Sequence, residues 1–293
     1  MVELVACWTM SHLKCKYWLY SILAGHFTLS ILSMPASTRP SVALCLITKD
    51  QNEDIREWVE YHRSIGVTNI IIFDNNSSKS CIHEIQDYAN SGFVNFYAFF
   101  THDDPRNKQQ HAYNLCLKNF GSKFSHIGFI DTDEFIVIKN KSSNIIDMME
   151  VYQSYPGLTL NSMFFGSSGH KERPAGGVLR NYNKCTKDAH IKAIVNTKLT
   201  DWNHGPHTFR HPPGKYPVDT NFKNVEGPWN PGRDQTPSDS LFEVIYLNHY
   251  VIKSYEDFKI KHKRGSGDIK RRAMDYFEQT DRRTTSTCEH LTP

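Results

Sequence analysis

The chain has 293 residues, of which 39% are hydrophobic and 12% aromatic, so it is long enough and apolar enough to enclose a full core. Its 34 Lys and Arg residues nearly balance its 31 Asp and Glu residues, so composition gives no sign of a nucleic-acid partner. The 7 cysteines include no C-x-x-C pair, which excludes the common zinc spacings and leaves disulfide pairing and redox compartment open.

The first 40 residues have the composition of a leader followed by a linker. Residues 17–34 are broadly apolar and follow Lys14 and Lys16, as in a signal-anchor. They include a histidine and several Ser and Thr residues, and they are short for the roughly 20 residues that cross a bilayer. Two interpretations stay open: a type II membrane anchor that places the domain in the Golgi or endomembrane lumen, or a leader on a soluble protein.

Apolar runs alternate with helical patterns from residue 41 onward. The expected strands are 42–48, 70–73, 94–100 and 127–138, and the expected helices are 52–64, 82–89 and 111–119. Continuous apolar runs of this kind are typical of strands that are buried on both faces. Alternation of such strands with helices predicts an α/β fold with a mainly parallel sheet flanked by helices.

Polar residues lie at the carboxyl ends of these strands. Lys49 and Asp50 follow the first strand, Asp74 ends the second, and Asp131 and Asp133 lie within the fourth apolar run. In open α/β sheets, ligands bind at the carboxyl ends of the parallel strands. We therefore expect these side chains to converge on one site.

The run Ile-Gly-Phe-Ile-Asp-Thr-Asp-Glu-Phe-Ile-Val-Ile at residues 127–138 sets three carboxylates into an apolar strand. Unpaired buried charges are costly, so such a cluster usually holds a cation, or its carboxylates share protons. The Asp-x-Asp spacing puts Asp131 and Asp133 on one face of an extended segment. Oxygen ligands suit Mg²⁺ or Mn²⁺, which commonly bridge phosphates. We predict that both bind a divalent cation, and that Glu134 either binds it through water or pairs with a Lys or Arg.

After residue 150 the chain contains long loops rich in Gly, Pro, His and Asn, of a kind that is usually functional or disordered. A strand is expected at 241–251 and a helix at 255–263, after which the tail, residues 266–293, is expected to fray. The loops carry aromatic and imidazole side chains that form either a sugar-stacking surface or ordinary loop packing, at spacings that match no standard zinc pattern. These are Trp202, His204, His207, His211 and Trp229.

Several separated segments, taken in order, resemble glycosyltransferase family 92 and the related family-2-like enzymes. They are Lys49-Asp-Gln-Asn-Glu53, Glu57-Trp58-Val-Glu-Tyr61-His62, Phe73-Asp74-Asn75-Asn76-Ser77-Ser78, Asp131-Thr-Asp-Glu-Phe135, Phe165-Gly-Ser-Ser-Gly-His170 and Asn248-His-Tyr250 with Lys253. The resemblance implies a GT-A fold with a Rossmann-like sheet over residues 41–265 and long C-terminal acceptor loops. It also implies that Asp131-Thr-Asp133 is a metal-binding DxD motif.

The resemblance implies transfer of a sugar from a nucleoside-diphosphate sugar, with UDP as the expected carrier, to a glycan hydroxyl. Inversion and dependence on Mn²⁺ or Mg²⁺ are expected with it. Asp74 is then expected to accept a hydrogen bond from a pyrimidine base, unless it only begins an Asx-turn. Thr48, Lys49 and Glu53 are expected to flank the nucleotide, although Glu53 also suits the first turn of a helix.

His249 ends the last predicted strand, and Lys253 lies four residues later. A neutral imidazole can complete a metal shell, and an ammonium can neutralise phosphate as a point charge. We expect these two roles here. Lys261 and Arg264 either extend the site into a basic clamp or form a solvated helix face.

An inverting transfer needs a base within hydrogen-bond reach of the acceptor hydroxyl. His170 and Glu172, in and after the glycine-rich loop at residues 166–169, are the first candidates. Asp219 and Glu226 stay open. The alternative is that the loop is a turn and that His170 only contacts the acceptor.

Two other functions fit the same motifs. Paired carboxylates at strand ends also serve metal-dependent phosphohydrolases, which release phosphate without an acceptor sugar. A non-catalytic relative that only binds glycans would bind sugar independently of metal and nucleotide.

Overall fold

The structure is a computed structural model, and it describes residues 18–19, 30–31, 39–99, 108–265 and 273–291. The chain divides into two compact units, residues 1–39 and 40–293. In the first, strands β1 (Trp18–Leu19) and β2 (Ser30–Ile31) form an antiparallel pair. Most of the predicted apolar segment at 17–34 lies outside the described residues. Within the described part of the chain, no helix combines the length and the apolarity that a membrane crossing requires.

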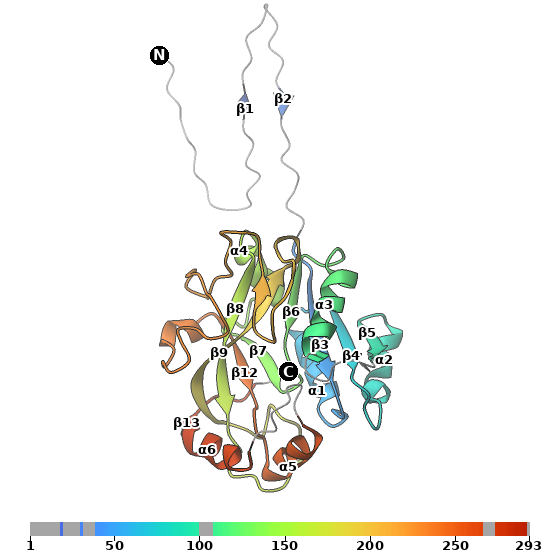
Figure 1. Ribbon diagram of the computed structural model, residues 1–293, viewed down its shortest axis with the longest axis vertical. Coiled ribbons are helices and arrows are strands. Elements are labelled where there is room, and N and C mark those ends of the chain that lie inside the picture. Colours follow the sequence, from blue (N-terminus) through green and yellow to red (C-terminus); the bar gives the residue numbers. More distant parts are fainter. Residues whose placement is uncertain (1–17, 20–29, 32–38, 100–107, 266–272, 292–293) are drawn as a thin grey trace, which may run out of the picture. The chain divides into compact units, whose positions relative to one another are not determined.

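The second unit is built on a nine-stranded mixed sheet. Its strands are β3 (Val42–Thr48), β4 (Asn69–Asp74), β5 (Val94–Ala98), β6 (His126–Phe129), β7 (Glu134–Ile138), β8 (Gly157–Phe165), β9 (Lys184–Asn196), β12 (Ile245–His249) and β13 (Ser286–Thr287). Their order is β5-β4-β3-β6-β9-β8-β12-β7, with β13 paired to β9 (Figure 1). The strands β5, β4, β3 and β6 are parallel neighbours, as the α/β prediction requires.

The other half of the sheet mixes directions. Strand β9 runs antiparallel to both β6 and β8, while β8 and β12 are parallel and β7 runs antiparallel to β12. A separate two-stranded sheet pairs β10 (Trp202–Asn203) with β11 (Phe209–Arg210). The long strand β9 therefore joins the parallel half of the sheet to the half formed by the C-terminal segments.

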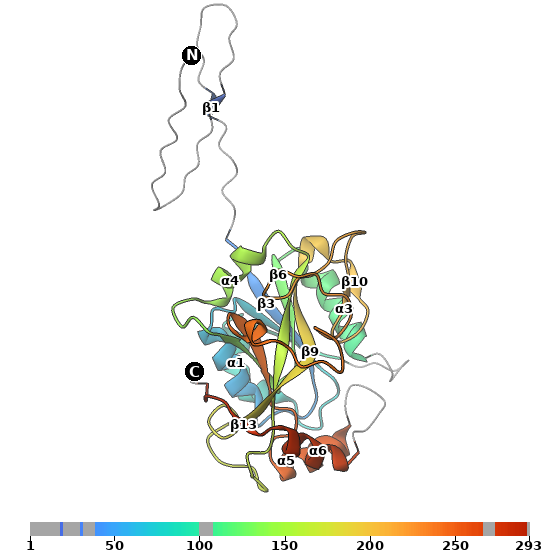
Figure 2. The same ribbon diagram turned by 90° about the vertical axis from the view of Figure 1, so that its left-hand side faces the viewer.

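Helices cover both faces of the sheet, as Figure 2 shows. Helices α1 (Ile55–Ser64) and α4 (Ile145–Tyr152) pack on one face, and α3 (Lys108–Phe120) packs on the other. The other helices and 3₁₀ turns are η1 (Cys81–Ile85), α2 (Gln86–Asn90), η2 (Thr197–Leu199), η3 (Asp239–Phe242), α5 (Tyr255–Arg264) and α6 (Asp275–Arg283). The helices expected at 52–64, 82–89 and 111–119 correspond to α1, to η1 with α2, and to α3.

The apolar run at residues 127–138 is two strands, and the prediction of a single strand is wrong. Strand β6 ends at Phe129, a turn follows, and β7 begins at Glu134 and pairs with β12. The turn is closed by a hydrogen bond of 3.0 Å from the backbone N–H of Glu134 to the carbonyl of Asp131. Asp residues favour turns, and the break moves Asp131 and Asp133 out of the sheet while both apolar halves stay buried.

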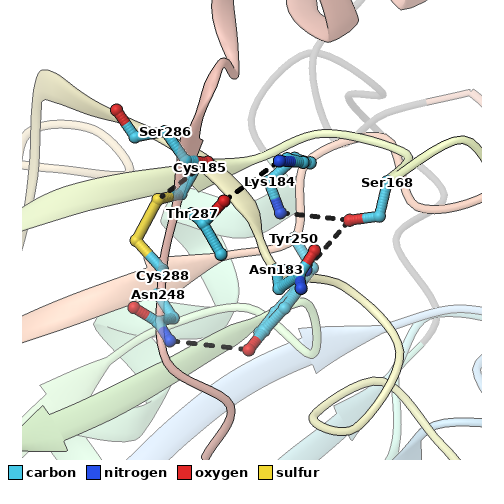
Figure 3. The surroundings of a disulfide bond; sticks show 9 residues. All are labelled: Ser168, Asn183, Lys184, Cys185, Asn248, Tyr250, Ser286, Thr287 and Cys288. Atoms are coloured by element: carbon cyan, nitrogen blue, oxygen red, sulfur yellow. Dashed lines mark hydrogen bonds between the residues drawn. A yellow bond between two sulfur atoms is a disulfide. The ribbon is translucent and has the colours of Figure 1, made fainter.

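The expected frayed tail is also corrected, because described residues 273–291 are held to the domain. Helix α6 lies beside α5 (Figures 1 and 2), and β13 pairs with β9. A disulfide joins Cys185 on β9 to Cys288 (Figure 3). Beside it, the hydroxyl of Ser168 accepts hydrogen bonds from the backbone N–H groups of Asn183 and Lys184 (Figure 3). The C-terminal segment is therefore fixed to the strand that crosses the middle of the sheet.

Replacing Cys185 or Cys288 by serine should lower the free energy of unfolding by about 2–5 kcal/mol. The disulfide links residues 103 positions apart and so restricts the unfolded chain. Urea denaturation of the two single variants and the double variant measures the effect. The double variant should be no less stable than either single variant, since all three lose the same bond. An unchanged unfolding midpoint after reduction of the wild type would contradict this account.

Candidate functional site

A cavity of about 1000 Å³ lies at the carboxyl ends of β3 and β6. It receives side chains from the turn after β6, from the segment after β3 and from the end of β12. Of the residues proposed from the sequence, it is lined by Thr48, Lys49, Glu53, Asp131, Asp133, His249 and Lys253. The expected convergence is therefore present for the ends of β3, β6 and β12, but it does not include Asp74 at the end of β4.

Asp74, His170 and Glu172 are not among the residues that line this cavity. The carboxylate of Asp74 accepts hydrogen bonds from the backbone N–H of Ser77 (3.0 Å) and the hydroxyl of Ser80 (3.1 Å), so it stabilises the turn that follows β4. Nε2 of His170 lies 3.0 Å from the carbonyl of Asn181, a contact within its own loop, and Glu172 is exposed. The base contact predicted for Asp74 and the catalytic role predicted for His170 and Glu172 stay predictions, and these positions do not favour them.

Helix α1 holds the turn between β6 and β7. The indole N–H of Trp58 donates to the carbonyls of Asp131 (3.1 Å) and Glu134 (2.8 Å). One turn later, Nδ1 of His62 donates to the carbonyl of Trp58 (2.8 Å), and Nε2 accepts from the backbone N–H of Ile136 (3.3 Å). The backbone of the acidic turn is therefore fixed independently of its carboxylates.

A buried ammonium balances two of the three carboxylates. Nζ of Lys192, on β9, lies 2.8 Å from Oδ2 of Asp131 and 3.3 Å from Oε2 of Glu134. Burial alone would lower the pKa of Lys192, but the two carboxylates outweigh burial and raise it well above its usual value. Glu134 is buried and also accepts from the backbone N–H of Asp131 (2.8 Å). Of its two predicted roles, Glu134 has the pairing role in this structure.

Sequence reasoning did not find Lys192. Its signal was a single lysine inside the apolar run at residues 189–195, where a charge needs a partner. The partner, Asp131, is 61 residues away in the sequence and comes beside it only through the pairing of β6 with β9.

Asp133 is balanced by a cation from a different element. Nζ of Lys261, on α5, lies 2.5 Å from Oδ2 of Asp133. Burial would raise the pKa of Asp133, but Lys261 and the neighbouring ring of His249 outweigh it and hold that pKa well below its usual value. The predicted basic clamp thus begins with an ion pair to the acidic turn itself.

A second ionic group borders the cavity; its Lys253 was expected from the sequence, whereas Asp54 and Arg173 were missed. The nearly buried carboxylate of Asp54 pairs with Lys253 and with Arg173, and Arg173 also contacts Oδ1 of Asp257 at 2.6 Å. Burial would raise the pKa of Asp54, but the two cations lower it. Lys253 has a positive φ of 54°, a strained conformation that is common at functional sites. This group ties the segment after the glycine-rich loop and the start of α5 to the start of α1.

The side chains around Asp133 suit a divalent cation chemically. Carboxylates of Asp131 and Asp133 and an imidazole are ligands that Mn²⁺ accepts. Nδ1 of His249 is buried and makes no hydrogen bond in the described structure, although it lies 3.5 Å from Oε1 of Glu134, and Nε2 lies 3.7 Å from Oδ1 of Asp133. Within the described ranges, no three His, Cys, Asp or Glu side chains are already grouped as a metal site. The donors fit an ion provided that the ammonium of Lys261 leaves Asp133.

The loop aromatics lie around two cavities, both of which His207 lines, and in a separate ring pair. His207 lines the main cavity, and its Nδ1 lies 2.7 Å from the carbonyl of Ile191. His211 lines a second cavity of about 330 Å³. The rings of Trp202 and His204 pack on each other at 4.2 Å. Loop packing therefore describes Trp202 and His204, and the sugar-stacking interpretation stays a prediction for the residues that line a cavity.

Comparison with known proteins gives one family. A family model described as glycosyltransferase family 92 matches residues 41–272. A family 92 protein of Oryza sativa subsp. japonica is 30% identical over 146 residues, which cover 48% of this chain and 24% of that protein. One of Ricinus communis is 30% identical over 152 residues, which cover 48% of this chain and 26% of that protein. The chain thus spans about a quarter of the length of these curated relatives.

Solved structures resemble the chain more distantly. S. aureus TarS 1–349 in complex with UDP gives a TM-score of 0.33 at 12% identity, covering 54% of this chain and 47% of that one. A mycobacterial protein gives a TM-score of 0.32 at 12% identity, covering 55% of this chain and 54% of that one.

Acidification should destabilise the protein because His62 is buried as a neutral ring. Burial lowers the pKa of His62 to about 3, while in the unfolded chain the pKa is about 6.5. Between these values the unfolded state binds a proton that the folded state does not. The free energy of unfolding should therefore fall as the pH drops below about 6.5, by at most about 1.4 kcal/mol per pH unit for this group.

Urea denaturation at pH 7, 6 and 5 measures this dependence. His62→Gln should show a shallower dependence on pH than the wild type, although it is less stable at pH 7. An equal slope in both proteins would show that His62 is not the group responsible.

Proposed function

The chain belongs to glycosyltransferase family 92, and we propose that it transfers a sugar from a nucleoside-diphosphate sugar to a glycan hydroxyl, with inversion. The observation that carries the proposal is the acidic turn of Asp131 and Asp133, which opens onto the cavity beside Lys253 and Lys261. Carboxylates for a cation and ammonium groups for phosphate oxygens are the two charge types that a diphosphate leaving group requires. UDP is the proposed carrier.

Asp131 and Asp133, with His249 as a third donor, would hold Mn²⁺ or Mg²⁺. Once bound, the ion supplies a Lewis acid that neutralises the developing charge of the leaving diphosphate. Lys192 keeps its place on Asp131 and Glu134 and so holds the Asp131 carboxylate in a fixed orientation.

The basic residues of α5 act on the phosphate side. If it moves from Asp133, Lys261 would pair with phosphate oxygens as a point charge. Arg264 Nη1 donates to the carbonyls of Lys49 (3.0 Å) and Asp50 (3.2 Å), which ties the end of α5 to the segment after β3. Thr48 and Glu53 line the same region of the cavity, where the nucleotide is proposed to bind. Nucleotide binding and the position of α5 are therefore expected to be coupled.

The two rival functions predict different reactions. A phosphohydrolase would release phosphate from a simple ester such as p-nitrophenyl phosphate, and a glycan-binding protein would bind sugar without metal or nucleotide. Family membership favours the transferase, because both rivals would have to depart from the activity that gives the family its name.

Asp131→Asn and Asp133→Asn should each lower the rate of sugar transfer by about 100-fold or more, since each removes a charge needed to hold the ion. The measurement is release of UDP from UDP-hexoses, with water or methyl hexosides as acceptors. EDTA should abolish the activity of the wild type, and Mn²⁺ should restore it. The matched control is Asp239→Asn, which changes an exposed acid on η3 that pairs with Lys187.

Thermal shift separates binding from turnover. UDP should raise the melting temperature of the wild type more with Mn²⁺ than without it, and this difference should disappear in Asp133→Asn. Full activity in either Asp variant or in EDTA would contradict the metal assignment. Phosphate release from p-nitrophenyl phosphate without use of UDP-hexoses would replace the transferase with the hydrolase.

A further inference from the structure

Strand β9 contains a bulge where it lines the cavity. On one side of the bulge Ile191 pairs with Asn161 of β8, but the next pair along β8 joins Ser162 to Asp188. Ala189 and His190 therefore face no residue of β8. Bulges of this kind re-aim side chains and are frequent beside active sites.

The bulge creates a carboxylate–imidazole pair. Oδ1 of Asp188 lies 2.5 Å from Nδ1 of His190 and accepts the backbone N–H of His190 at 3.0 Å. The second oxygen, Oδ2, accepts from Arg283 of α6 at 2.8 Å. Burial would raise the pKa of Asp188, but the bonds from His190 and Arg283 outweigh it and lower that pKa to about 2. Asp188 is therefore a fixed anion at neutral pH.

The imidazole of His190 lines the cavity, and the carboxylate of Asp188 is more deeply buried. His190 lines the cavity and its side chain is 41% exposed, whereas that of Asp188 is 11% exposed. Because Asp188 engages Nδ1, Nε2 is the ring nitrogen left to meet a ligand. Acid–base catalysis commonly uses this arrangement, in which a buried acid orients an imidazole whose other nitrogen faces the reacting group.

Aromatic side chains surround this imidazole. The ring of Phe164 is stacked at 5.7 Å from His190, that of His207 lies at 5.9 Å, and Trp229 meets it edge-on at 6.0 Å. The indole N–H of Trp229 is buried and has no hydrogen-bond partner within the described structure. Phe164 and His207 line the cavity, whereas Trp229 packs behind His190, so the two cavity rings are the ones that suit the apolar face of a sugar.

The same strand connects this wall to the acidic turn. Lys192, two residues after His190, pairs with Asp131, so both residues act on the same cavity from β9. A sugar held between the acidic turn and His190 would contact both groups.

We propose that His190 is the general base of the transfer and that Asp188 orients it, an inference that rests on the proposed transferase function. The acceptor is a sugar hydroxyl bound against Phe164 and His207. His190 takes the place that the sequence had suggested for His170 and Glu172, neither of which lines the cavity.

In the transfer, the oxygen of the acceptor hydroxyl forms a bond to the anomeric carbon of the donor sugar. The bond from that carbon to the diphosphate oxygen breaks, and its electron pair leaves with the diphosphate. The hydroxyl proton moves to Nε2 of His190, and the imidazolium, stabilised by Asp188, later releases it to water. Arg283 keeps Asp188 in position and contacts no reacting atom, so it is a positioning residue.

His190→Gln tests the proposal, because glutamine keeps a polar side chain but takes up no proton. We expect kcat for UDP release from UDP-hexoses, with methyl hexosides as acceptors, to fall about 100-fold or more. The affinity for UDP with Mn²⁺, measured by calorimetry, should stay within about twofold. In His190→Ala, added imidazole should restore part of the rate, which a purely structural role would not allow. The control is His83→Gln, an exposed histidine on η1 that should keep wild-type kcat.

The outcomes separate the two claims. If the wild type transfers sugar and Asp131→Asn is inactive, but His190→Gln keeps kcat within about threefold, the base assignment is overturned and the transferase stands. If His190→Ala loses activity without rescue by imidazole and also loses UDP binding, His190 is structural and the assignment is again overturned. If the wild type neither binds UDP nor uses UDP-hexoses, the proposed function itself fails.

Discussion

The buried ammonium of Lys192 is the interaction on which the site depends. Asp131 and Glu134 lie at the junction of β6 and β7, where solvent does not balance their charges fully. Removing one partner of such a group leaves an uncompensated buried charge, which is strongly destabilising. Lys192 allows the acidic turn to lie inside a folded domain, and Lys261 does the same for Asp133 from the helix that borders the cavity. Charge balance thus links β9, α5 and the turn.

The backbone of the turn has a separate support. Trp58 and His62 of α1 bind carbonyl and N–H groups of β7 and the turn, so the position of the carboxylates does not depend on what they bind. This division would suit the proposed exchange of cations, in which the ammonium of Lys261 leaves Asp133 while the backbone stays in place. Preorganised charges of this kind need little rearrangement when a charged ligand binds.

Local sequence patterns predicted the parallel half of the sheet well. Apolar runs such as 42–48 and 70–73 are bounded by turn residues, and their polar ends necessarily meet at one edge. The same patterns failed where pairing is long-range. The break at Asp131 depends on β12, more than 100 residues later, which draws β7 away from β6. The ordered C-terminal segment depends on Cys185 and Cys288, whose pairing a cysteine count leaves open.

Prediction of the site's side chains also succeeded where local pattern decides and failed where long-range pairing decides. Asp131, Asp133 and His249 lie at strand ends and were identified from sequence, whereas Lys192 and Asp54 were not, because their partners are distant in sequence. His190 was missed for a further reason: strict alternation along β9 gives no hint of a bulge, which exists only in the register with β8. His170 was predicted instead because it follows the glycine-rich loop at 166–169, and glycine-rich turns can be recognised in a sequence whereas a bulge cannot.

The central claim is that the acidic turn exchanges the ammonium of Lys261 for a divalent cation when a nucleoside diphosphate binds. The most direct measurement is an anomalous difference map from crystals of the protein grown with Mn²⁺ and UDP. The account predicts a manganese peak within about 2.3 Å of carboxylate oxygens of both Asp131 and Asp133, with Lys261 moved from Asp133 toward the diphosphate. UDP bound in the cavity with no manganese peak there, and with Lys261 still on Asp133, would contradict it.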